Sequence, residues 1–270
     1  MSEPSPRPAD GTPQGTPPPE GEVQLTFLDH LRDLRKRITH ALYGVVLGML
    51  AVGLFVERIF HLLMDPVLAS LPKEQQTLQY TSYVEPLMVY LKVALYGGVF
   101  LSAPWLLFQI WLFIAPGLYK REKKVVVPFL AVGTTLFYGG AAFCYFLVMP
   151  AAFPAMAAIA SDAALRPMLT MSETLSLVLA MLLGFGIVFE LPVVLAFLSM
   201  IGLVSAETLA KHRRIAVIVN VAVAAIITPT GDPLNLAMMA VPMIVFYELG
   251  VIAARILGKK PVAGDALAKV

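Results

Sequence analysis

The sequence predicts an all-α integral membrane protein in which six kinked transmembrane helices form a concave bundle. Three observations support this fold class. Hydrophobic residues make up 58% of the 270 residues, and the mean hydropathy is +0.78. Charged residues make up only 14%, whereas they are about 25% of a typical soluble domain, so the apolar side chains need lipid around them. The apolar residues also gather into runs, most of them close to the roughly 20 residues that cross a bilayer as a helix.

Residues 1–24 differ from the rest of the chain and are predicted to form a disordered, proline-rich tail. They contain seven prolines and almost no large apolar side chain, so folding them would bury too little surface to offset the entropy of ordering. They lack the basic start and apolar core of a cleaved signal peptide. Residues 258–270 are expected to form a second flexible tail, which leaves residues 25–257 as the transmembrane domain.

Residues 25–37 are predicted to form an amphipathic helix that lies at the membrane interface and then turns into the first span. Its apolar side chains recur at helical spacing; they are Phe27, Leu31, Leu34 and Ile38. Asp33 lies about one turn from Lys36 and Arg37, with which it can form ion pairs on the helix surface. An anchoring helix and a ligand-binding helix both fit this pattern.

Six apolar runs are interpreted as transmembrane helices. They are residues 38–56, 86–115, 125–148, 175–200, 215–227 and 236–257. The fifth run is short, and the turn sequence TPTGDP follows it, so it is either a short crossing helix or half of a re-entrant hairpin. Prolines in or beside the runs each favour a kink, and kinked helices can leave a concave face; they are Pro86, Pro104, Pro116, Pro128, Pro150, Pro192 and Pro242.

The distribution of basic residues predicts the orientation of the chain in the membrane. Fifteen of the 20 Lys and Arg residues fall in segments that an even number of spans places on one side, against Arg58, Lys73 and Arg166 on the other. Because cytoplasmic segments are enriched in basic residues, both termini are predicted to be cytoplasmic. This result requires an even number of spans and so favours counting residues 215–227 as a span.

Glu190, in the sequence FGIVFELPVV, is the most informative polar residue of the spans. It lies roughly 14 Å from the cytoplasmic end of its helix at a rise of about 1.5 Å per residue. An acidic side chain at such a depth costs about 2.5–3.5 kcal/mol on insertion scales, so it must be protonated, paired or in a wet cavity, and it marks a functional hypothesis. Pro192 frees a backbone carbonyl nearby. The alternative is a neutral glutamic acid that is hydrogen-bonded between helices.

The loop APGLYKREKK carries one acid, Glu122, among four cations. A solvated cytoplasmic loop is the simplest explanation. A carboxylate also suits bidentate recognition of a guanidinium group, and Asp33 lies on the same side of the membrane. The two carboxylates together could hold two arginines of another polypeptide. Phe113 fits either an interfacial aromatic residue or a contact with that partner.

The residues give little support for catalysis. The four histidines lie near span ends or outside the spans, and the membrane runs contain no HExxH motif, cysteine cluster or Ser/His pair. The dipeptide Gly231–Asp232 falls in an external turn without a second membrane aspartate. Cys144 is the one cysteine and is expected to be a packing residue. We therefore expect no enzyme activity, no metal, no cofactor and no binding of nucleic acid.

Three classes of function remain open on the residues alone. The first is recognition of a polypeptide at the cytoplasmic face. The second is proton-coupled transport of a small molecule, in which Glu190 would be the coupling acid; the internal repeat that many transporters have is not found here. The third is a purely structural scaffold, for which the cytoplasmic acids would have no role in transport.

Dispersed segments of the chain resemble the TatC family, the multispanning subunit of the twin-arginine protein translocase. They are FLDHLRDLRKRI, SAPWLLFQIWLFIAPGLYKREKK, FGIVFELPVVL and ITPTGDPLNLAMMAVP with FYELG, in family order within residues 25–257. The resemblance implies six helices shaped like a cupped hand in the prokaryotic cytoplasmic (inner) membrane. It also implies a receptor for the twin-arginine signal peptides of folded cargo and a core subunit of the Sec-independent translocase. Export would be driven by the proton-motive force, with the single-span subunits TatA and TatB as partners and self-association in a receptor complex.

The resemblance also implies roles for particular residues. The signal-peptide site would be formed by Leu31, Asp33, Arg35, Phe113 and Glu122. The family usually has Glu at the position of Asp33, so this chain keeps the charge but shortens the side chain by one methylene. Glu190 corresponds to the buried acid of the family's concave pocket. Pro66 matches the proline of the first external loop, which helps to shape the external cap.

A partner-helix contact is the one implied site at which this chain departs from the family. Near the start of the last span the family commonly has Gln where Leu236 stands. The family uses polar residues around the fifth and sixth spans to dock partner helices. Thr228 or Asn235 would have to supply that polarity here.

Overall fold

The computed structural model describes residues 20–71, 77–114, 126–162, 169–227 and 233–258. In these residues the regular elements are helices, and an isolated bridge between Gln79 and Thr170 is the one β-type pairing. The elements are α1 (Glu20–Gly53), α2 (Val56–Ala69), α3 (Glu85–Ile114), α4 (Val126–Phe143), the π-helical turn η4 (Cys144–Val148), α5 (Met149–Asp162), α6 (Met171–Phe189), α7 (Leu191–Met200), α8 (Ala206–Lys211), α9 (Arg213–Ile227) and α10 (Pro233–Leu257). The predicted all-α class is confirmed.

Four of the described helical stretches are long and apolar enough to cross a membrane. They are Glu85–Phe113, Val127–Ala158, Met171–Met200 and Leu236–Leu257. Leu31–Gly53 and α2 together form a fifth candidate that is bent by 86°. The helix α9 has 15 residues and does not reach the length that a full span needs. The count of six spans therefore stays a prediction that depends on α9.

The helix α1 is continuous over 34 residues, so the predicted turn between an interfacial helix and the first span is wrong. The reason is that no proline or glycine interrupts the chain between Gly21 and Gly44, and each residue in that stretch can propagate a helix. The helix also begins at Glu20, inside the segment 1–24 that was predicted to be disordered. The first span and the amphipathic segment thus form a single long rod.

The α-helical hydrogen-bond pattern is interrupted near some of the predicted prolines and continues past others. The span from Met171 to Met200 breaks at Glu190, two residues before Pro192, and η4 ends just before Pro150. Pro104 and Pro242, in contrast, lie inside helices that continue on both sides of them. Pro66 lies half-buried within α2, so the external segment that carries it is a helix there and not an irregular loop.

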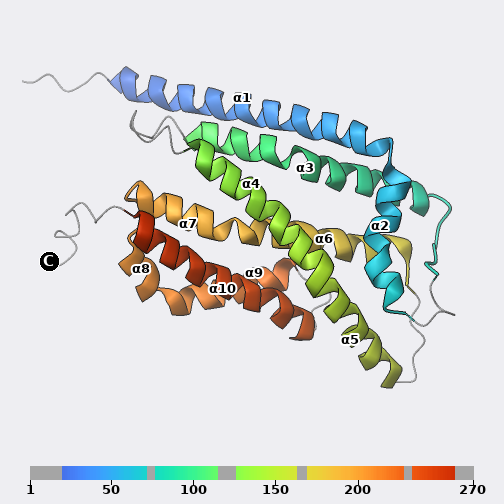
Figure 1. Ribbon diagram of the computed structural model, residues 1–270. Coiled ribbons are helices and arrows are strands. Elements are labelled where there is room, and N and C mark those ends of the chain that lie inside the picture. The colour runs from blue at the N-terminus through green and yellow to red at the C-terminus, as the bar shows by residue number, and fades with distance from the viewer. Residues whose placement is uncertain (1–19, 72–76, 115–125, 163–168, 228–232, 259–270) are drawn as a thin grey trace, which may run out of the picture.

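The α6–α7 span lies at the centre of the bundle. Of its most apolar window 61% is buried, against 28–33% for the three other full-length spans. In Figure 1 it runs between α3 on one side and α10 on the other, and α4 crosses it. Phe185 and Leu175 on this span are among the largest fully buried side chains of the core. A polar group on α6 or α7 is therefore held inside the protein rather than exposed to lipid.

The rod α1 packs along α3 through a close backbone contact. A Cβ atom placed on Gly48 would lie 2.6 Å from the carbonyl oxygen of Gly98, which leaves no room for a side chain. The indole N–H of Trp105 donates a hydrogen bond of 2.9 Å to the carbonyl oxygen of His40. Small residues at such crossings let membrane helices approach one another.

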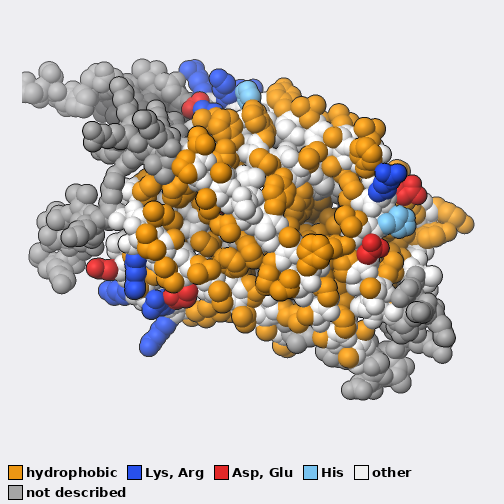
Figure 2. All heavy atoms as spheres, in the orientation of Figure 1, with side chains coloured by type: hydrophobic (Ala, Val, Ile, Leu, Met, Phe, Trp, Pro, Cys, Tyr) orange, Lys and Arg blue, Asp and Glu red, His pale blue; other side chains and the backbone are white. Residues whose placement is uncertain are grey.

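The charged side chains gather at the two ends of the molecule, and an apolar belt separates them (Figure 2). The start of α1, the end of α3, the start of α4, the short helix α8 with the start of α9, and the end of α10 lie together at one end (Figure 1). The basic residues of these segments are Arg32, Arg35, Lys36, Arg37, Lys211, Arg213, Arg214 and Arg255. We call this end of the molecule the basic end. Its assignment to the cytoplasmic side stays a prediction.

Candidate functional site

Asp33 and Phe113 lie at the basic end of the α1–α3 pair. The two helices are antiparallel, and the hydrogen bond from Trp105 to His40 fixes their register. When this register is continued toward the start of α1, Asp33 comes level with Phe113 at the end of α3. Two of the residues predicted to bind a signal peptide therefore lie at the same level of the α1–α3 pair, although they are far apart in the sequence.

Asp33 forms no ion pair with the side chains of α1 that the structure describes. Its side chain is half-buried, and within the described residues the ion pairs expected with Lys36 and Arg37 do not form. Leu31 is 44% exposed, and Arg35 is exposed as well. A carboxylate beside exposed apolar surface can accept hydrogen bonds from an incoming guanidinium group. This part of α1 thus offers both a charge and an apolar contact.

Glu122, the second predicted acid, lies outside the described residues. The structure does not test whether Glu122 approaches Asp33. The helices on either side of it are described: α3 ends at Ile114 and α4 begins at Val126, both at the basic end. The segment that carries Glu122 therefore joins two helix ends at the level where Asp33 and Phe113 lie.

Glu190 lies at the break between α6 and α7. Its backbone N–H donates to the carbonyl oxygen of Ile187 at 3.0 Å, three residues back, as in a tightened last turn. Pro192 has no N–H to continue the hydrogen-bond ladder, and α7 starts at Leu191. Glu190 is thus the residue that precedes α7, and its side chain makes no hydrogen bond to the first turn of that helix. The break lies beside Pro192, whereas a backbone carbonyl freed by Pro192 stays a prediction.

The carboxylate of Glu190 points into the bundle toward α4. Its Oε1 atom is buried, and no hydrogen-bond partner for it exists among the described residues. The nearest feature of α4 is Gly133, where an added Cβ atom would lie 2.9 Å from Oε2. Buried polar atoms almost always have a partner in folded proteins, so an exception marks a candidate site. The sequence indicated Glu190 but gave no sign of Gly133.

An apolar cavity lies beside this break, between α4, α7 and α10. Its volume is about 220 Å³, and its lining includes Phe129, Val132, Pro192 and Val193. A larger open groove of about 500 Å³ runs between α1 and α3 past Trp105. Both hollows are almost entirely apolar, as surfaces against lipid tails or an apolar peptide segment would be.

A polar network joins α3 to α6 at the end opposite the basic end. Lys92 donates hydrogen bonds to the hydroxyl oxygens of Ser172 at 2.9 Å and of Ser176 at 3.0 Å. The backbone N–H of Ser172 donates to Oε1 of Glu85 at 3.0 Å, and the N–H of Thr81 donates to Oε2. No local pattern links Lys92 to these two serines, because they lie 80 and 84 residues further along the chain.

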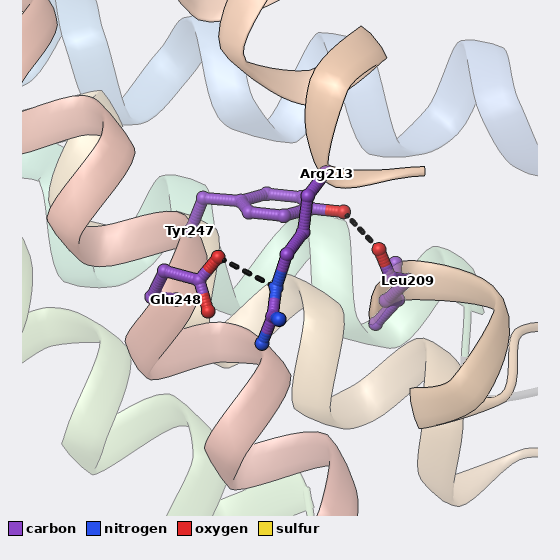
Figure 3. A network of polar contacts seen from close by, with 4 residues as sticks. All are labelled: Leu209, Arg213, Tyr247 and Glu248. Carbon is purple, nitrogen blue, oxygen red and sulfur yellow. Dashed lines mark hydrogen bonds and ion pairs between the residues drawn. The ribbon is translucent and has the colours of Figure 1, made fainter. Parts of the chain in front are cut away.

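A second network fastens α8 and α9 to α10 near the basic end (Figure 3). The guanidinium Nε of Arg213 lies 2.8 Å from Oε1 of Glu248, and the hydroxyl of Tyr247 donates to the carbonyl oxygen of Leu209 at 2.9 Å. Tyr247 and Glu248 belong to the sequence FYELG. The side chains of the ion pair are 47% and 40% exposed, so solvent weakens it.

The predicted partner-helix contacts are not tested. Thr228 lies outside the described residues, and Asn235 lies on α10 without a described side chain. Among the described residues of α9 and α10, the buried polar side chain is that of Asn220 on α9. Its Nδ2 atom lies 3.5 Å from the carbonyl oxygen of Met243 on α10. Its side chain faces α10 and therefore serves packing between the two helices.

Residues 29–242 match the family model described as Sec-independent protein translocase protein (TatC). The chain is 39% identical over 239 residues to the Sec-independent protein translocase protein TatC of Desulforapulum autotrophicum, which covers 88% of this chain and 87% of that protein. It is 35% identical over 229 residues to TatC of Escherichia coli K12, which covers 85% of this chain and 88% of that protein.

A solved structure agrees with the sequence matches. The crystal structure of the twin-arginine translocase receptor TatC is similar to this chain with a TM-score of 0.76 at 32% identity. The similarity covers 84% of this chain and 99% of that one. The agreement therefore extends over nearly the whole arrangement of helices described above.

Proposed function

Because the chain belongs to the TatC family of Sec-independent protein translocase proteins, we propose that it carries the site that binds twin-arginine signal peptides. The chain is a multi-pass membrane protein and a subunit of the twin-arginine translocase, and it is not an enzyme. The observation that carries the proposed site is the position of Asp33. This residue is half-buried, forms no ion pair with the described side chains of its helix, and is level with Phe113 at the basic end.

In the proposed complex, Asp33 and Glu122 pair with the two signal-peptide arginines. Leu31, Arg35 and Phe113 surround the two pairs and partly exclude water from them. This exclusion matters because an exposed ion pair is worth only about 0–1 kcal/mol. Specificity for paired arginines therefore depends on both carboxylates together and on the apolar contacts beside them.

The apolar segment of the signal peptide then enters the bundle on the side of Glu190. The hollows near α4 and α7 and along α3 are lined by apolar side chains that suit such a segment. The same proposal includes residence in the inner membrane and export of folded cargo driven by the proton-motive force. It also includes TatA and TatB as single-span partners and self-association in a receptor complex. Thr228 and Asn235 are the proposed contacts for a partner helix.

The test is crosslinking of a twin-arginine signal peptide to the translocase that contains Glu122→Ala or Glu122→Gln. We expect both variants to lose most of the crosslink, because each removes one of the two charges. Glu57→Gln is the matched control, since Glu57 is an exposed acid on α2, away from the basic end. Unaltered binding to both Glu122 variants would remove that residue from the site.

A further inference from the structure

Gly133 on α4 faces the Glu190 carboxylate. A Cβ atom on Gly133 would meet Oε2 at 2.9 Å, Oε1 at 3.3 Å and Cδ at 3.5 Å, and these are its three nearest neighbours. Real Cβ atoms almost never approach another heavy atom within 3.0 Å. The carboxylate therefore occupies the space that any side chain at position 133 would need.

We infer that Gly133 is a positioning residue for Glu190: its missing side chain creates the place in which the carboxylate lies. The inference rests on the proposed function in so far as Glu190 belongs to the binding side of the bundle. It assigns to α4 a role that neither the charge pattern nor the proline pattern indicates.

The backbone cannot easily shift to make room for a side chain at position 133, because α4 and α6 are already in close contact. A Cβ atom on Gly140 would lie 2.5 Å from the carbonyl oxygen of Phe185, and one on Gly186 would lie 2.8 Å from the ring of Phe137. These contacts hold the two helices together next to Gly133. A methyl group at position 133 would thus displace the Glu190 side chain rather than separate the helices.

The other end of Glu190 is fixed as well. Its N–H is bonded to Ile187, and its carbonyl oxygen accepts the N–H of Val194 at 3.0 Å. Only the side-chain torsions are left to respond to an added methyl group. The displaced carboxylate would leave its buried place against α4. Its Oε1 atom has no hydrogen-bond partner among the described residues. After the displacement, this atom would no longer face a hydrogen-bond donor that enters the bundle.

The test is the rate at which dicyclohexylcarbodiimide, an apolar carboxyl reagent, modifies Glu190 in the full-length chain, measured by peptide mass spectrometry. We expect Gly133→Ala to raise the rate severalfold, because the carboxyl group displaced from its buried place against α4 becomes accessible to the reagent. The matched control is Gly139→Ala on the same helix, where an added Cβ would meet nothing within 4 Å. An unchanged or lower rate in Gly133→Ala would overturn the inference.

Two further variants separate positioning from simple packing and from the proposed function. Glu190→Asp shortens the side chain by one methylene and draws the carboxylate away from α4, so adding Gly133→Ala to this variant should not lower signal-peptide crosslinking further. An equal loss in both backgrounds would mean that Gly133 serves helix packing alone.

If Glu190→Gln leaves export intact while Gly133→Ala still changes carbodiimide labelling, the proposed role of Glu190 fails and its positioning by Gly133 stands.

Discussion

A carboxylate recognises a guanidinium group through two oxygens, and the length of its side chain decides only how far those oxygens reach. We therefore expect Asp33→Glu to support export of a twin-arginine reporter at close to the unaltered level. Asp33→Lys should abolish export, because it places a cation where the signal arginines bind. Pulse-chase measurement of reporter export in cells checks both. Export that survives Asp33→Lys would contradict the role of Asp33.

The ion pair between Arg213 and Glu248 should contribute little to stability, although its atoms lie 2.8 Å apart. Both side chains are well exposed, and exposed pairs are worth about 0–1 kcal/mol. Glu248→Gln is thus expected to lower the free energy of unfolding by less than about 1 kcal/mol, measured by denaturant titration in detergent micelles. A loss of several kcal/mol would contradict this and show that the pair is desolvated in the micelle-embedded protein.

Single residues were predictable from the sequence where they stood out from their surroundings. Glu190 could be identified because it is an acid in an apolar run, and its place inside the bundle follows from the central position of α6 and α7. The bonds of Lys92 to Ser172 and Ser176 could not be predicted. Their formation depends on the packing of α3 against α6, which no local pattern encodes.

At the scale of elements, the close contact between α1 and α3 can be tested with two glycine substitutions on α1, one at the contact and one away from it. Gly48→Ala would place a Cβ 2.6 Å from the backbone oxygen of Gly98, whereas at Gly53 an added Cβ meets nothing within 4 Å. Overpacking of this kind costs typically about 1–3 kcal/mol. Gly48→Ala should therefore lower the melting temperature in detergent, and Gly53→Ala should leave it nearly unchanged. Equal effects of the two variants would argue against the close contact.

The boundaries of the elements show why patterns locate helices better than they locate turns. The second apolar run was predicted to span 86–115 and forms α3 at Glu85–Ile114, because hydropathy marks the stretch that lipid surrounds. The turn predicted after residue 37 does not form. Amphipathic and apolar stretches are both compatible with helix, so the change of pattern there alters what surrounds α1 and not its backbone.

For the whole molecule, the family matches and the solved structure favour a translocase subunit over the small-molecule transporter that Glu190 alone would have allowed. Motifs spread over the chain already indicated the translocase family from the sequence. It could not decide the number of spans, because α9 has only 15 residues. At about 1.5 Å per residue such a helix is shorter than the roughly 30 Å of a bilayer core, and its neighbours must shelter its ends if it crosses.

Six spans place the connection between α9 and α10 on the outside of the membrane, and a re-entrant hairpin does not. In a Cys144→Ala background, which removes the buried native thiol, Thr230→Cys should react with a membrane-impermeant maleimide in intact cells. Arg58→Cys on α2 is the external control, and Lys211→Cys at the basic end should react only after the membrane is permeabilised. Labelling of Thr230→Cys only in permeabilised cells would mean that α9 does not cross. If α10 then crosses alone, an odd number of spans separates the two ends of the chain, and the basic segments can no longer all share the cytoplasmic side.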